Sequence, residues 1–192
     1  MVTLRIDSIQ NPRYQATFER YKLGKKYNPR QSIVGTYLLA DWLAETPAVI
    51  ASGRLFDHGP HGKPRLKSGA PQYNLANSYD KVVLAVADQP IGVDLEKIRP
   101  YDYHRIHRAF RPEELDYLAG LSGAEQVRAT FKIWTIKEAV LKLVGMGIPG
   151  GIRSMQIDLK TFAHANRYGQ SIRLSPLYVG MDYVGTIAQF EE

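Results

Sequence analysis

Apolar residues recur at helical spacing in residues 131–144, a segment without Pro or Gly that ends at Gly145. At about 100° per residue, Ile133, Ile136 and Val140 fall on one side, which predicts a helix that faces the core. The opposite side holds apolar and charged residues together: Trp134, Lys137, Glu138, Leu141 and Lys142. A solvated face has little reason to carry a Trp and a Leu, so we interpret this side as the wall of a cleft. The alternative is a surface helix whose Glu138 and Lys142 form an i,i+4 pair worth a few tenths of a kcal/mol.

Residues 91–96 alternate strictly between apolar and polar positions, as in a half-buried strand. Asp94 and Glu96 therefore lie on one face, with Cα atoms roughly 7 Å apart. Two carboxylates so placed repel each other unless a cation or hydrogen-bond donors lie between them. Together with Glu138 they predict a three-carboxylate site for Mg²⁺, an ion that takes its remaining ligands from water and from a substrate phosphate, which Lys142 would face. An edge strand that exposes its charges to water is the alternative.

The remaining pattern predicts strands and helices along the whole chain. The sequence predicts helices at residues 12–23, 33–45 and between 100 and 144, and strands at 2–7, 49–56, 81–87, 154–160, 167–174 and 182–189. Each half runs from a strand through helices to antiparallel strands. We therefore expect an α+β fold in two halves, residues 1–90 and 91–192, that pack as one unit.

Composition sets limits without indicating a function. With 192 residues and 44% hydrophobic content, the chain can bury a proper core. It has no cysteine, which excludes disulfides and thiolate metal sites. No stretch has the apolar run of a signal peptide or of a membrane span, so a soluble cytoplasmic protein is expected. The formal net charge of +6 favours anionic partners without distinguishing nucleic acid, membrane, phosphate ligand or acidic protein.

Two motifs together carry a resemblance to a known family. Gly92-Val-Asp94-Leu-Glu96 is followed some 40 residues later by Trp134-Thr-Ile-Lys137-Glu138-Ala-Val-Leu-Lys142. In this order and at this separation, the motifs resemble those of the 4′-phosphopantetheinyl transferases, especially the longer surfactin-synthetase type. The resemblance implies that family's fold, in which two similar α/β halves with mostly antiparallel sheets are related by a pseudo-twofold axis.

The resemblance also implies an activity, the transfer of 4′-phosphopantetheine from coenzyme A to a serine hydroxyl of an apo acyl, peptidyl or aryl carrier protein, with release of 3′,5′-ADP. Asp94, Glu96 and Glu138 would hold Mg²⁺, or Mn²⁺ in its place, and Glu138 and Lys142 would act on the reacting phosphate. Glu114 aligns with a family glutamate proposed to take the acceptor's proton, although acids in the first turn of a helix also complement its dipole. Neither nucleic acid nor membrane is an expected partner, and the protein is expected to be a monomer.

Coenzyme contacts are implied for residues outside the two motifs. Arg30 belongs to a basic cluster in a region where the family binds the coenzyme, and a solvated loop is the alternative for this cluster. The other members of the cluster are Lys22, Lys25 and Lys26. Lys63, within a Gly-Lys-Pro tripeptide, matches a family lysine that approaches the phosphates of the coenzyme.

Residues 73–78 stand where the family usually shows Phe-Asn-x-Ser-His-Ser. Ser78 matches this pattern and is expected to contact the coenzyme. Ala76 and Asn77 replace the usual Ser-His pair. Asn77 therefore takes the place of the histidine that approaches the 3′-phosphate of coenzyme A in the family.

Two other function classes remain as alternatives. A metal-dependent nuclease also uses Asp, Glu and Lys, usually in an acidic-x-Lys arrangement on a strand, but here Glu138 and Lys142 are four residues apart on a predicted helix. A non-catalytic relative that binds coenzyme A or a carrier protein is the nearer alternative, because Ala76 and Asn77 depart from the family pattern. The complete set of Asp94, Glu96, Glu138 and Lys142 favours the enzyme.

Overall fold

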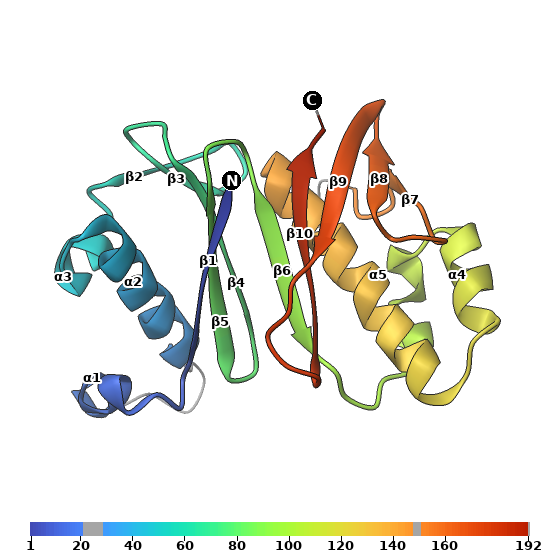
Figure 1. Ribbon diagram of the computed structural model, residues 1–192, viewed down its shortest axis with the longest axis horizontal. Helices are drawn as coiled ribbons and strands as arrows, with labels where there is room; N and C mark the ends of the chain where they lie inside the picture. The colour runs from blue at the N-terminus through green and yellow to red at the C-terminus, as the bar shows by residue number, and fades with distance from the viewer. Residues whose placement is uncertain (21–28, 148–150, 192) are drawn as a thin grey trace.

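The computed structural model describes residues 1–20, 29–147 and 151–191. Its main strands form two antiparallel sheets that lie face to face, and helices cover the outer side of each sheet (Figure 1). This arrangement of helices and antiparallel sheets confirms the predicted α+β class. Within the described residues, no helix is long and apolar enough to cross a membrane. The division at residue 90 stays a prediction.

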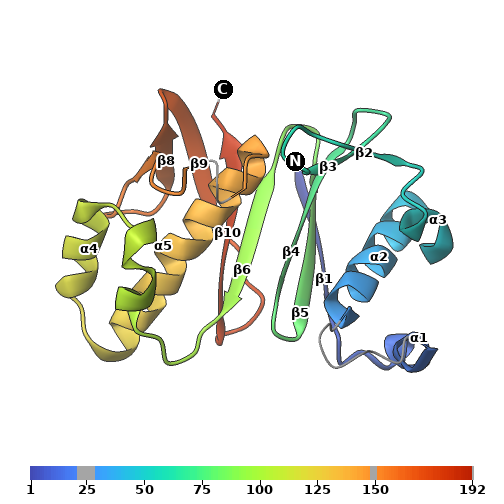
Figure 2. The ribbon, with the colours of Figure 1, turned by 180° about the vertical axis from the view of Figure 1, so that it is seen from behind.

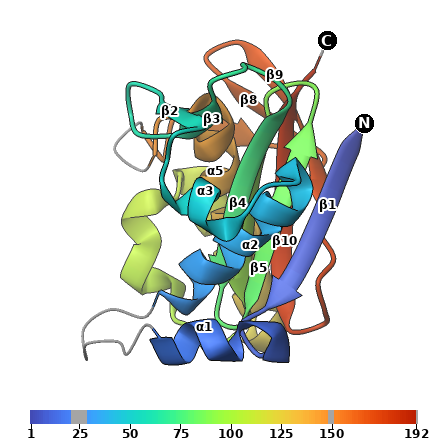
Figure 3. The same cartoon turned by 90° about the vertical axis from the view of Figure 1, so that its left-hand side faces the viewer.

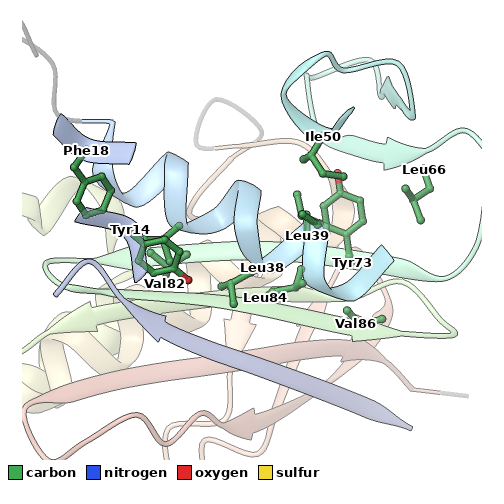
Figure 4. Packing of buried hydrophobic residues seen from close by; sticks show 12 residues of the cluster. Tyr14, Phe18, Leu38, Leu39, Ile50, Leu66, Tyr73, Val82, Leu84 and Val86 are labelled. Atoms are coloured by element: carbon green, nitrogen blue, oxygen red, sulfur yellow. The ribbon is translucent and has the colours of Figure 1, made fainter. Parts of the chain in front are cut away.

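The first sheet has the order β1 (Val2–Ser8), β5 (Lys81–Ala87), β4 (Gln72–Ser78). β5 is apolar along its length because it is central and covered on both faces. Its outer face packs under α2 (Arg30–Leu43), and Figure 4 shows Leu38 and Leu39 of this helix above the strands. Viewed from the side of α2, the helices of this half lie in front of the first sheet (Figure 3). The other two of these helices are α1 (Gln15–Arg20), which follows η1 (Pro12–Tyr14), and α3 (Pro47–Ala51).

The second sheet begins with β6 (Gly92–Lys97), which lies at its edge beside β10 (Tyr183–Phe190). The remaining strands follow in the order β9 (Gln170–Pro176), β8 (His164–Arg167) and β7 (Met155–Ile157). The long helix α5 (Gly123–Val144) crosses the outer face of this sheet, and α4 (Pro112–Ala119) packs beside α5 (Figure 2). A further turn of helix, η2 (Tyr103–Ala109), precedes α4.

The inner faces of the two sheets share one apolar core. Its members include Val83 and Ala85 from β5, and Val93, Leu95 and Ile187 from the second sheet. At one side of this core, β4 approaches the outer edge of β6 through side chains. Asn74 Oδ1 accepts a hydrogen bond from the Val93 amide at 2.8 Å, and Ser78 Oγ accepts one from the Lys97 amide at 3.0 Å.

Ala76 lies between these two acceptors on the same face of β4. Because backbone amides alternate in direction along a strand, the Leu95 amide points to the same side as those of Val93 and Lys97. The methyl group of Ala76 offers it no acceptor. Ala76 thus leaves a gap in the row of side-chain acceptors on β4.

Two predicted strands are wrong. Residues 49–56 were expected to form one strand, but the chain first forms α3 and only then β2 (Phe56–His58), which pairs with β3 (Pro64–Leu66). Pro47 occupies the first turn of α3, and the Thr46 hydroxyl caps it by accepting from the Val49 amide, so local capping overrides the β-branched residues.

Residues 167–174 were also expected to form a single strand. They contain the turn between β8 and β9, where Tyr168 and Gly169 have φ of 50° and 83°. Two consecutive residues of positive φ make the tight turn that suits a two-residue hairpin. Lys22, Lys25 and Lys26 of the predicted basic cluster lie outside the described residues.

Candidate active site

β6 and α5 bring the two sequence motifs together. Gly92 faces the helix so closely that a Cβ atom at this position would lie 2.0 Å from the carbonyl oxygen of Ala139. A side chain here would push α5 away from the strand, which explains the glycine at the start of the first motif. Asp94 and Glu96 follow on the same face of β6, toward the helix that carries Glu138 and Lys142.

Asp94 is 7% exposed and, among the residues that the structure describes, pairs with one cation. Its Oδ1 lies 2.7 Å from Lys142 Nζ. Its Oδ2 is buried and has no hydrogen-bond partner among the described residues. Burial raises the pKa of Asp94 to about 7, although Lys142 opposes the shift. A carboxylate in this state is held in place but lacks ligands for one oxygen.

Glu138 and Glu96 complete a cluster of negative charge. Glu138 Oε1 is also buried without a partner in the part of the chain that the structure describes, and burial raises the pKa of this residue. Glu96 contributes an unfavourable Coulombic interaction to both Asp94 and Glu138. Its Oε2 accepts a hydrogen bond from Ser78 Oγ at 2.8 Å and lies 3.8 Å from a guanidinium nitrogen of Arg99.

The chemistry of this cluster fits a hard divalent cation. Carboxylate oxygens that are buried, mutually repelling and without hydrogen-bond donors are the ligands that Mg²⁺ prefers. Two such oxygens, Asp94 Oδ2 and Glu138 Oε1, are found here. Across residues 1–20, 29–147 and 151–191, however, no three acidic or histidine side chains are already gathered closely enough to hold an ion. The three-carboxylate site therefore stays a prediction.

The interpretation of one side of α5 as the wall of a cleft is wrong for Lys137 and Leu141, which are both 0% exposed. Lys137 Nζ lies 2.9 Å from Glu114 Oε2 and donates to the carbonyl oxygen of Ile152 at 3.1 Å. Burial lowers the pKa of Lys137 and raises that of Glu114, and the attraction between the two charges opposes both shifts. The periodicity of the helix did not reveal this, because the partner that makes a buried lysine tolerable lies on α4.

Glu114 is 1% exposed at the start of α4. Its Oε2 accepts a hydrogen bond from the Arg111 amide at 2.7 Å, and its Oε1 is buried without a partner among the described residues. Its predicted role as the general base stays a prediction, and because the side chain is 1% exposed, the role requires the residues that enclose it to move. The alternative role, in which Glu114 complements the helix dipole, agrees with its hydrogen bond to the amide at the start of α4.

Lys63 contacts backbone carbonyls that belong to the C-terminal half. Its Nζ donates to the carbonyl oxygen of Ile91 at 3.0 Å and to that of Leu143 at 3.3 Å. The second bond satisfies a carbonyl of the last turn of α5, where a cation also complements the helix dipole. Burial lowers the pKa of Lys63 to about 8. Lys63 thus ties the β2–β3 loop to the end of the motif helix.

Of the other predicted coenzyme contacts, two are exposed and one bonds a carboxylate of the cluster. Arg30 is exposed at the first residue of α2, with its guanidinium 5.4 Å from the ring centre of Phe18. Asn77 is exposed near the end of β4. Ser78 is buried and bonds Glu96, so it orients a carboxylate instead of facing solvent. Neither this role nor that of Asn74 was predicted from the sequence. Polar residues at positions 72, 74 and 78, which share one face of the strand, were the available signal.

Comparison with known proteins gives one matching family. The model described as the 4′-phosphopantetheinyl transferase superfamily matches residues 90–188, which is more than half of the chain. Two similar proteins are the 4′-phosphopantetheinyl transferase psf-1 of Bacillus pumilus, 32% identical over 146 residues, and the 4′-phosphopantetheinyl transferase gsp of Aneurinibacillus migulanus, 30% identical over 144 residues. A third, the 4′-phosphopantetheinyl transferase Sfp of Bacillus subtilis (strain 168), is 25% identical over 135 residues.

These alignments cover 76%, 75% and 70% of this chain. They cover 62%, 60% and 60% of the three relatives' own lengths. The chain thus spans less than two thirds of the curated relatives that it matches.

Proposed function

The chain belongs to the 4′-phosphopantetheinyl transferase superfamily, and we propose that it transfers 4′-phosphopantetheine from coenzyme A to a serine of an apo carrier protein. The serine oxygen forms a bond to the β-phosphorus of coenzyme A, the bond from that phosphorus to the bridging oxygen breaks, and 3′,5′-ADP leaves. The serine proton passes to a base. The observation that carries the proposal is the pair of buried, partnerless oxygens on Asp94 and Glu138, located in the two family motifs beside Lys142.

The residues of the cluster have distinct tasks in this proposal. Asp94, Glu96 and Glu138 would hold Mg²⁺, or Mn²⁺ in its place, which when bound offsets the negative charge of the pyrophosphate. Lys142 holds Asp94 in the present arrangement and would turn its ammonium toward a phosphate oxygen when the coenzyme is bound. Ser78 keeps Glu96 oriented through its hydroxyl. Positioning and charge compensation are the main needs of phosphoryl transfer, and this set supplies both.

The proposed partners follow from the reaction. Coenzyme A is the co-substrate, and Arg30, Lys63 and Asn77 are the residues we propose for its anionic parts. The acceptor is an acyl, peptidyl or aryl carrier protein, and we propose a monomer that needs neither nucleic acid nor membrane. We further propose that the protein works in the cytoplasm.

One assay tests the proposal directly. The protein is incubated with coenzyme A, Mg²⁺ and an apo carrier protein, and intact-mass spectrometry looks for addition of phosphopantetheine to the carrier. We expect addition with the parent protein and nearly none with Asp94→Asn, because the metal requires the charge of this carboxylate. Asp88→Asn is the matched control, since that side chain is 86% exposed and should leave the rate unchanged.

The same assay separates the alternatives. Binding of coenzyme A without any transfer, across several acyl, peptidyl and aryl carriers and with Mg²⁺ or Mn²⁺, would identify a non-catalytic relative. Equal rates for Asp94→Asn and the parent at saturating Mg²⁺ would remove the carboxylate cluster from the mechanism.

A further inference from the structure

A second concave site lies away from the carboxylate cluster. A pocket of about 670 Å³ opens between the first half of α5, the loop that joins β9 to β10, and Phe162. Asp94, Glu96, Glu138, Lys142 and Lys63 are all absent from its lining. Its volume lies in the range of pockets that enclose a single small molecule.

The walls of this pocket are mainly apolar. The rings of Tyr117 and Phe162 pack edge to face, with centroids 5.7 Å apart, and form one wall. Tyr178 and Met181 stand on the β9–β10 loop and are 83% and 90% exposed. Large apolar side chains at the rim of a concave site provide surface that a ligand with an apolar body can cover.

Two cations line the same pocket from one face of α5. Arg128 and Lys132 are four residues apart, so their side chains lie one turn from each other. Arg128 donates to the carbonyl oxygen of Met181 at 3.3 Å. Glu125 also lines the pocket, yet neither cation forms an ion pair within the described ranges.

Lys132 is the more constrained of the two. Burial lowers the pKa of this lysine, and the nearby charge of Arg128 lowers it further. A cation that is partly enclosed by apolar walls and has a second cation as its neighbour is stabilised by an anion that enters the site. The pocket therefore combines an apolar surface with two cations that have no ion-pair partner among the described residues.

We propose that this pocket binds a small organic anion, with an apolar ring system against Tyr117 and Phe162 and an acidic group held by Lys132 and Arg128. The site is separate from the proposed transfer of phosphopantetheine and does not depend on it. A small molecule fits better than a protein surface, because the site is a concave pocket of one-ligand size and not an extended flat face.

Fluorescence titration with anilinonaphthalene sulfonate tests the site, because this probe joins an aromatic body to one anionic group. Phenylnaphthylamine, which has the same rings without the sulfonate, separates the effect of charge from that of apolar contact. We expect Lys132→Gln to raise the Kd of the sulfonate about tenfold and to change the Kd of the neutral probe less than about twofold. Lys160→Gln, at an exposed lysine on the same half, is the control and should change neither Kd.

Equal Kd values of the sulfonate for Lys132→Gln and the parent would overturn the proposal, as would the same loss in Lys160→Gln. Saturating coenzyme A should leave the probe bound. Displacement of the probe by coenzyme A would place the probe at the carboxylate cluster and overturn the assignment. A thermal melt of each variant confirms that the protein is folded during the titration.

Discussion

The ammonium of Lys137 lies 2.9 Å from Glu114 Oε2, and neither side chain is open to solvent. This pair joins the start of α4 to the middle of α5, one residue before Glu138. A carboxylate enclosed with a cation is suited to fixing two helices relative to each other. Its use as a general base would require the residues that enclose the carboxylate to move during each reaction.

The first prediction follows from that enclosure. Glu114→Gln leaves the Lys137 charge buried without its counter-ion, so we expect the free energy of unfolding to fall by about 3–5 kcal/mol. Urea unfolding monitored by circular dichroism measures the change. The double variant Glu114→Gln, Lys137→Met should recover part of this loss, because no buried charge remains.

The matched control for this pair is Glu113→Gln at a neighbouring carboxylate that is 48% exposed, for which we expect almost no change in stability. A contrary outcome would be a Glu114→Gln protein of unchanged stability and strongly reduced transfer. That result would assign Glu114 to proton removal and not to the joint between α4 and α5.

The second prediction concerns pH and Lys63. The pKa of Lys63 is about 8 in the folded protein and near its usual 10.5 in the unfolded chain, so between these pH values the unfolded chain binds more protons. The free energy of unfolding of the parent should therefore gain a rising contribution from about pH 8 to about 10.5. Lys63→Met should remove this contribution, as measured by urea unfolding at several pH values.

Lys67→Met is the comparison for Lys63, because Lys67 is an exposed lysine close by in the chain. It should keep the pH dependence of the parent. If the curves of the parent and of Lys63→Met run parallel between pH 8 and 10.5, Lys63 keeps an ordinary pKa, and its bonds to Ile91 and Leu143 do not bury it in solution.

The third prediction concerns the missing acceptor on β4. Ala76→Ser should place a hydroxyl beside the Leu95 amide, and we expect a gain of about 1 kcal/mol in the free energy of unfolding. Ala76→Val tests whether added volume alone has this effect, and it should destabilise because the site is 1% exposed. Thermal unfolding of the three proteins provides the measurement. Equal destabilisation by Ser and Val would mean that the hydroxyl finds no donor there.

The fourth prediction rests on Asn77, which is exposed and which the family resemblance aligns with a histidine. A neutral amide binds a phosphate more weakly than a cationic donor, so coenzyme A should be preferred over 3′-dephospho-coenzyme A by about tenfold or less. Asn77→His should increase this preference, more at about pH 6 than at about pH 8, because only the protonated ring is a cation. Transfer kinetics with both coenzymes measure it.

The competing explanation for the 3′-phosphate is a contact from another basic residue, Lys63, Arg65 or Lys81. In that case the parent would already discriminate far more than tenfold, and Asn77→His would add nothing. Lys63 donates to two backbone carbonyls, and Lys81 lies beside Asp80 with 3.2 Å between ammonium and carboxylate, so both are less available than Arg65.

The sequence predicted the elements whose pattern is set locally. α5 and β6 were expected because apolar spacing in each is regular and because Gly145 marks the end of the helix. The prediction of a strand at residues 49–56 was wrong because the helix cap at Thr46 outweighed the strand propensity of the residues that follow it.

The sequence indicated which residues belong to the candidate site, but not which distant residues they contact. Asp94, Glu138 and Lys142 were assigned from motif spacing, and their placement beside each other needs only one strand and one helix. The enclosure of Lys137 depends on Glu114, 23 residues earlier in the chain, and Lys63 reaches a carbonyl 80 residues later. Periodicity within one element carries no information about such distant partners, since they are fixed by how the elements pack.

The joint between the two sheets also has a mechanical consequence. In the part of the chain that the structure describes, β4 and β6 meet through the side chains of Asn74 and Ser78, without a ladder of backbone hydrogen bonds. A force that pulls the sheets apart would break these two bonds, the hydrogen bonds from Ser78 to Glu96 and from Tyr183 to Asp80, and the apolar contacts before any strand leaves its own sheet. The short stretch between β5 and β6, residues 88–91, would then act as a tether that keeps the separated halves within reach of each other.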